Sequence, residues 1–187
     1  MRLRNFVIAA LLGVVFAAAS IAVASNVHLK GGPSAEPTFT DQGLTLNAQG
    51  DLTGLGQEQL KVTLTATGNP TAICTNPSGK QQPPGQNPAE VTLTGVQTIN
   101  PNQIDKNGNA HFNVTTAAPT SPIPSSSPDF SCPGANWTET ITDVAFTTAR
   151  ITVEQPPGTT VLTINCTFSS PTSNGTVPGS NVSCTQS

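Results

Sequence analysis

The sequence predicts an all-β protein, a β-sandwich of about seven to eight strands with long Pro-rich loops and two disulfides. Several short segments rich in Thr, Val and Ile alternate apolar with polar residues, as a strand with one buried and one wet face requires. Turn-forming Gly, Pro and Asn separate these segments. Beyond the first two dozen residues, no stretch shows sustained helical periodicity.

The chain begins with a segment typical of a secretory signal peptide. Residues 1–4 include two arginines, residues 6–24 contain no charge and no proline, and small residues at Ala22 and Ala24 indicate a cleavage site. A retained membrane anchor is the alternative, because the apolar run is close in length to a spanning helix. The small-residue exit favours cleavage after residue 24. We therefore expect a secreted protein, extracellular or periplasmic, that is free of the membrane afterwards.

Low charge excludes one class of partner. Charged residues make up 9% of the chain, about a third of the usual share. Loss of Arg2 and Arg4 with the leader leaves five scattered basic residues against ten acidic ones. A nucleic-acid binder needs clustered Lys and Arg to neutralise phosphates. We expect no nucleic-acid partner.

Four cysteines in an exported chain indicate two disulfides. Three pairings are possible, and we favour the one that joins Cys74 to Cys132 and Cys166 to Cys184. A zinc site is the weaker interpretation, because no two cysteines are close in sequence and the histidines are not at ligand spacing. We expect no metal and no cofactor.

A flexible lead-in over residues 25–37 is expected before a single domain that spans residues 38–187. Its first strand signals are at Phe39 and at residues 44–46. The clearest strand covers residues 60–67, and Gly68-Asn69-Pro70 is expected to end it. Further strands are predicted at 71–75 and 91–99, with a Pro/Gly/Gln-rich loop over 76–89 between them.

The second half of the domain continues this pattern. Asn107-Gly108 predicts a tight hairpin turn with positive φ angles, followed by a strand from Ala110 to Val114. The longest loop covers residues 117–136. Strands follow at 141–153 and 161–168, and the apolar positions of the first change parity, so we expect a bulge within 147–150. A Ser/Asn/Gly-rich tail starts at residue 169.

One stretch carries a family resemblance. The segment from Asp105 to Val114 resembles the D-x-N-G-x-A-x-F-x-V hairpin of bacterial immunoglobulin-like domains of surface proteins, and residues 60–67 resemble the strand that precedes it. This resemblance implies an immunoglobulin-like β-sandwich and says nothing about ligands. The chain is also similar to small secreted bacterial proteins of unknown role that share the Cys-Thr-Asn-Pro and Asn-Trp-Thr-Glu-Thr-Ile-Thr-Asp stretches.

Few residues suggest chemistry. Glu139 and Asp143 form the one close carboxylate pair on a predicted strand, and a four-residue offset would place them on one face about 13 Å apart, long for a glycosidase pair. A serine hydrolase needs a base, and His111 is expected to point to solvent. Two further candidates are a weak calcium site at Asp105, Asn107 and Asn109, and Trp137, expected either as a surface anchor or as a buried plug.

Two functions remain open at this stage. The first is a secreted, non-enzymatic binding or structural module of the cell envelope or extracellular matrix, which binds an unknown protein or surface polymer through its loops or a strand edge. The alternative is a small secreted hydrolase that uses surface carboxylates such as Glu139 and Asp143.

Overall fold

Two antiparallel sheets make up the protein in the computed structural model, which describes residues 26–83 and 88–187. The expected signal peptide, residues 1–24, lies outside the described residues. The first sheet contains β1 (His28–Leu29), β2 (Thr38–Asp41), β3 (Leu46–Thr53), β7 (Ala110–Thr115) and β10 (Gly175–Thr176). The second contains β4 (Leu60–Thr75), β5 (Gln81–Gln82), β6 (Val91–Ile99), β8 (Thr138–Glu154), β9 (Thr160–Phe168) and β11 (Val182–Gln186). Two short 3-10 helices are η1 (Pro101–Gln103) and η2 (Gly179–Asn181).

The sheets share one apolar core, so the all-β prediction with two disulfides is confirmed. Alternation along each strand sends one set of side chains inward, and β4 shows it clearly from Leu60 to Ala66. Phe39, Phe112 and Phe146 are completely buried between the sheets. Phe168 meets Phe39 edge-to-face with ring centroids 5.2 Å apart. The described residues form more strands than expected, because several have only two residues.

The solvent face of the second sheet explains why the chain is rich in Thr and poor in charge. Residues that share this face come into register across five strands, and most are Thr or Ser. Cross-strand pairs of β-branched hydroxyl residues stabilise a sheet without ionic groups. One row consists of Ser183, Thr167, Thr148, Thr67 and Thr92.

The longest ladder joins β4 to β8 and contains the expected bulge. Thr67 pairs with Thr148 while Gly68 pairs with Phe146, so Thr147 is left over on β8. This confirms the bulge predicted within residues 147–150. A second shift, unforeseen, lies between Thr71 and Ala72 of β4, opposite Thr142. The two bulges let β8 keep its apolar side chains on the inner face although their parity changes twice.

The prediction that Gly68-Asn69-Pro70 ends a strand is wrong, because β4 runs through it to Thr75. Two local conditions allow this. A Cβ at Gly68 would lie 2.8 Å from the carbonyl oxygen of Ala145, so only glycine fits beside the bulged β8. Pro70 lies beyond the end of β6, whose pairing with β4 stops at Gly68. The missing N–H of a proline therefore costs no ladder bond at this free edge.

The hairpin prediction at residues 105–114 is half right. The turn forms, with Gly108 N–H donating to the Asp105 carbonyl at 3.0 Å, but Gly108 alone in it has positive φ. The strands on its two sides do not pair, since β6 joins β4 in one sheet and β7 joins β3 in the other. The turn therefore connects the two sheets instead of closing a hairpin.

The expected lead-in and the tail that starts at residue 169 both contribute strands to the sheets. Within residues 26–37, β1 pairs with the end of β3, and Leu29 is buried. In the tail, β11 pairs with β9 along five residues and β10 pairs with β2. Gln186 reaches back across the chain and donates to the carbonyl of Ala35 at 3.1 Å. The first and last segments of the domain thus hold each other in place.

Both favoured disulfides are present. Cys166 pairs with Cys184 across the ladder between β9 and β11, and Cys74 of β4 is bonded to Cys132 in the long loop before β8. Disulfides persist in oxidising compartments, so they indicate an extracellular or periplasmic environment. In residues 26–83 and 88–187, no helix is long and apolar enough to cross a membrane.

Replacement of Gly95 tests how closely the two sheets approach. A Cβ there would overlap the carbonyl oxygen of Thr115, so β6 and the end of β7 would have to separate. We expect Gly95→Ala to lower the free energy of unfolding in urea by about 3 kcal/mol. Gly179→Ala is the control, because nothing lies within 4 Å of a Cβ there. Equal stability of the two variants would contradict this packing.

Candidate functional site

The two carboxylates of the expected hydrolytic pair differ in burial and lie on different faces of β8. Glu139 is completely buried, so it is not a surface carboxylate. The bulge at Thr142 lies between Glu139 and Asp143 and shifts the inner face from Ile141 to Val144. Asp143 therefore does not share the inward face of Glu139. The sequence expectation of one exposed face is wrong because it assumed an unbroken strand.

Glu139 instead holds the long loop onto the β4–β8 ribbon. Its carboxylate accepts hydrogen bonds from the backbone N–H of Ser131 at 2.7 Å and from the Ser131 hydroxyl at 2.6 Å. Its backbone carbonyl accepts from the N–H of Ile123 at 2.8 Å. The Cys74–Cys132 disulfide closes the same region, because Cys74 is the partner of Glu139 in the ladder. A buried carboxylate with two donors is compensated for its lost hydration.

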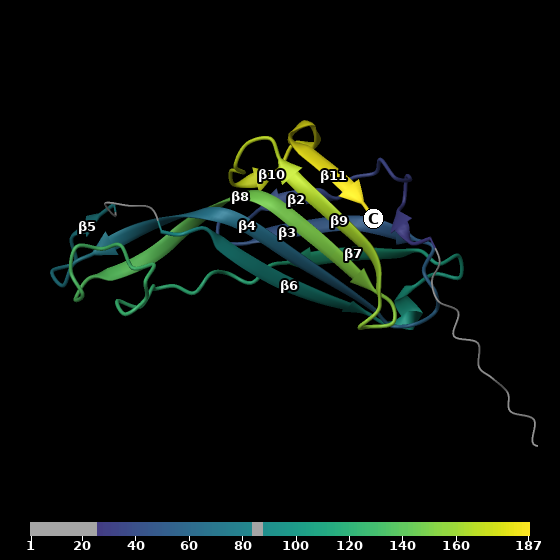
Figure 1. Ribbon diagram of the computed structural model, residues 1–187, viewed down its shortest axis with the longest axis horizontal. Helices are drawn as coiled ribbons and strands as arrows, with labels where there is room; N and C mark the ends of the chain where they lie inside the picture. Colours follow the sequence, from purple (N-terminus) through teal and green to yellow (C-terminus); the bar gives the residue numbers. More distant parts are fainter. Residues whose placement is uncertain (1–25, 84–87) are drawn as a thin grey trace, which may run out of the picture.

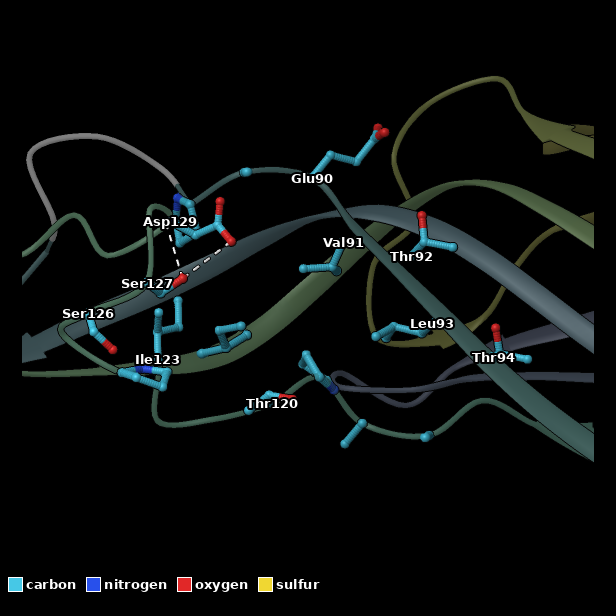
Figure 2. Close-up of a pocket in the computed structure, with 17 residues that line it drawn as sticks. Glu90, Val91, Thr92, Leu93, Thr94, Thr120, Ile123, Ser126, Ser127 and Asp129 are labelled. Atoms are coloured by element: carbon cyan, nitrogen blue, oxygen red, sulfur yellow. Dashed lines mark hydrogen bonds between the residues drawn. The ribbon is translucent and has the colours of Figure 1, made fainter.

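This anchored loop forms one wall of a groove of about 630 Å³. The opposite wall is the start of β6 with the residues just before it, and Ile141 of β8 lies at the base. Figure 2 shows β6 crossing the view opposite the loop that carries Thr120, Ile123 and Ser126. The start of β6 and the loop before β8, which line the groove, lie in the half of the molecule where β4 and β8 extend toward β5 (Figure 1). Its size is in the range of ligand pockets.

The β6 wall offers a partly unpaired strand edge. The N–H of Ala117 donates to the carbonyl of Thr94 at 2.9 Å, which shows that the backbone groups of Thr94 point away from β4. Backbone direction alternates along a strand, so those of Thr92 also point away from β4. Among the described residues, Thr92 has no backbone partner at this edge. The edge of β6 that faces away from β4 is therefore hydrogen-bonded to the loop at Thr94, and it is open at Thr92.

The lining combines apolar side chains, Thr and Ser hydroxyl groups, and two carboxylates. Leu93 and Ile123 are buried against the groove, and prolines stand in both walls. Glu90 and Asp129 are the only ionisable residues in the lining, and neither takes part in an ion pair in the described part of the chain. The Asp129 carboxylate accepts only a long hydrogen bond, 3.5 Å, from the Ser127 hydroxyl. The groove is therefore mixed in polarity inside, with two exposed carboxylates at its rim.

A second pair of carboxylates lies on the other side of β8. The Asp41 side chain is buried and accepts from the N–H of Gly43 and from the Thr172 hydroxyl. Oδ1 of Asp143 is buried nearby without a hydrogen-bond partner. Burial, and then the negative charge of Asp41, raise the pKa of Asp143 above its usual value. Nothing else in this cluster indicates a ligand.

The proposed calcium residues build the turn itself. Oδ1 of Asp105 accepts from the N–H groups of Asn107 and Asn109, and Oδ2 accepts from the Asn109 side chain. The Asn109 side-chain bond, followed by its backbone bond, lowers the pKa of Asp105. Both carboxylate oxygens of Asp105 therefore accept hydrogen bonds within the turn. Calcium binding at this site stays a prediction.

Trp137 and His111 are the two remaining single candidates. Trp137 is half-buried beside Gly134, between the two placements expected for it, and its role as a surface anchor stays a prediction. His111 is exposed, as expected, and its Nδ1 lies 3.0 Å from Oδ1 of Asp51.

Comparison with known proteins found no matching family, curated protein or solved structure. The groove was missed by sequence reasoning, although its parts were noted separately as the strand at 91–99 and the Pro-rich loop that starts at residue 117. The one usable signal was the pair of cysteines that tie this loop to β4.

Removal of the Ser131 hydroxyl tests the loop anchor. Ser131→Ala leaves one oxygen of a fully buried carboxylate without its donor. We expect the free energy of unfolding to fall by about 2 kcal/mol, measured in urea. Ser126→Ala, at an exposed hydroxyl in the same loop, should change it by less than about 0.5 kcal/mol. A loss of the same small size for Ser131→Ala would show that Glu139 does not hold the loop.

Asp143 gives a pH-dependent prediction. A raised pKa means that the folded state holds the proton more tightly than the unfolded state, so this group favours folding at low pH and loses that contribution as pH rises through its folded pKa. Asp143→Asn should therefore raise the free energy of unfolding at pH 7. The gain should shrink as pH falls toward 4, whereas Asp129→Asn, at an exposed surface position, should stay within about 0.5 kcal/mol of the wild type. Urea unfolding from pH 4 to 7 measures both.

Proposed function

We propose that this protein is an exported, non-enzymatic binding module that holds an extended polypeptide segment by strand addition at β6. The observation that supports the proposal is the open edge at Thr92, which forms a wall of the groove. An added strand gains main-chain hydrogen bonds from such an edge and selectivity from the pockets for its alternate side chains. The fixed loop opposite gives the bound segment a second surface to contact.

Three contacts hold the loop wall of the groove in one conformation. The Cys74–Cys132 disulfide, the Glu139 carboxylate and the Ala117–Thr94 hydrogen bond each fix a different part of the loop. A groove that does not have to order itself loses less conformational entropy on binding. Loops are usually the mobile parts of a domain. A loop that is fixed beside a groove therefore supports a binding role.

Export is part of the same proposal. The leader-like residues 1–24 and the two disulfides both agree with a protein that acts outside the cytoplasm, in the envelope or the extracellular matrix. The hydrolase alternative loses its support, since Glu139 is buried and serves the loop.

Proline at the groove edge tests strand addition. Thr92→Pro removes an N–H that points away from β4, so the ladder between β4 and β6 stays intact. Thr98→Pro is the matched control, since Thr98 has the same backbone direction but lies outside the groove. The ligand set is a display library of linear twelve-residue peptides panned on the wild-type protein.

We expect enriched peptides to bind the wild type and Thr98→Pro alike, and Thr92→Pro at least about tenfold more weakly, because a main-chain bond and the register are lost. Fluorescence anisotropy of the synthesised peptides measures this. Equal affinity for all three proteins, enrichment of no peptide, or capture by a polysaccharide that competes with the peptides would contradict strand addition.

A further inference from the structure

We infer that the segment held in the groove alternates basic with apolar side chains, the apolar ones facing the loop and the basic ones facing the solvent side of β6. This inference rests on the proposed function and adds the chemistry of the partner: a cationic, extended peptide. It follows from which way the side chains of β6 point and from the charges at the two rims.

The two faces of the β6 wall differ in chemistry. Figure 2 shows Val91 and Leu93 pointing toward the loop, while Glu90, Thr92 and Thr94 point the other way. A strand added to β6 continues the same alternation, so every second residue of the guest shares the face of Val91 and Leu93. That face meets buried Ile123 and Ile141, both in the groove lining. These guest positions therefore favour apolar side chains.

The intervening guest positions share the face of Glu90. Its carboxylate is exposed and unpaired among the described residues. Asp129 is on the loop wall and not on this face, and its exposed carboxylate adds a second negative charge to the field around the groove. Among the described lining residues there is no Lys, Arg or His to offset these two charges. A basic guest side chain brings the missing cation, whereas an acidic one adds a third negative charge. Opposite charges at an exposed rim contribute mainly to selectivity and to the association rate.

Exposed charges also make the preference dependent on salt. Each carboxylate at the rim is solvated, so its attraction for a cation is small at physiological ionic strength and grows as salt is lowered. The apolar and main-chain contacts have no such dependence. Charge preference and strand addition can therefore be measured separately on the same protein.

Three capped nine-residue peptides test the inference on the full disulfide-bonded protein. The first alternates Lys with Val, and the other two replace every Lys by Gln or by Glu. Each is measured by anisotropy at low and physiological salt against four proteins. These are the wild type, Glu90→Gln with Asp129→Asn, Glu58→Gln with Asp51→Asn as a control of equal charge change away from the groove, and Thr92→Pro.

We expect the Lys peptide to bind the wild type about tenfold more tightly than the Gln peptide at low salt, and the Glu peptide to bind most weakly. The Glu90/Asp129 variant should lose most of this preference and the control variant should keep it. Equal binding of the Lys and Gln peptides, both weakened by Thr92→Pro, would overturn the cationic partner and leave strand addition standing. Two other results would show charge attraction outside the groove and overturn the inference. One is a preference for the Lys peptide that is as large in Thr92→Pro as in the wild type. The other is a preference that the Glu58/Asp51 control loses as fully as the Glu90/Asp129 variant. If none of the peptides binds the wild type, both proposals fail.

Discussion

The pairing of β4 with β8 is the constraint on which the rest of the structure depends. These two strands are the longest in the protein, and they continue past the region where the first sheet covers them. The bulges at Thr142 and Thr147 let β8 follow β4 over its whole length with apolar side chains still inward. A one-residue slip without them would turn Val144 and Phe146 to solvent. The position of Glu139, and hence of the loop, follows from this register.

The sequence pattern predicted the structure correctly where only one arrangement could satisfy the residues involved. The parity change between Phe146 and Ile151 requires an irregularity, because a continuous strand cannot alternate its inner face. The favoured pairing of Cys166 with Cys184 is confirmed, and the ladder between β9 and β11 brings the two residues opposite each other. By contrast, Gly68-Asn69-Pro70 has the composition of a turn. It stays in β4 because β8 crowds Gly68 and because Pro70 faces an edge that β6 has already left.

The groove could not be predicted from local pattern, because its walls come from different parts of the fold. Strand 91–99 was predicted with its correct bounds, yet nothing in its sequence tells which edge stays open. The edge of β6 stays open because β7 joins the first sheet instead of pairing with β6. The sequence of residues 105–114 predicted the opposite, a hairpin in which these two strands pair. Glu139 looked like a surface carboxylate for a similar reason. Its burial requires a bulge three residues further on and a serine eight residues earlier, and neither has a distinctive sequence signal.

An open strand edge promotes aggregation unless a protein covers it or uses it. Here the chain covers part of the edge, because Ala117 occupies it at Thr94 and the loop then turns away from Thr92. The loop forms a second wall beside the uncovered part. The carboxylates at the rim of the groove repel another copy of this acidic chain. The geometry that we propose for a cationic peptide therefore disfavours self-association through β6.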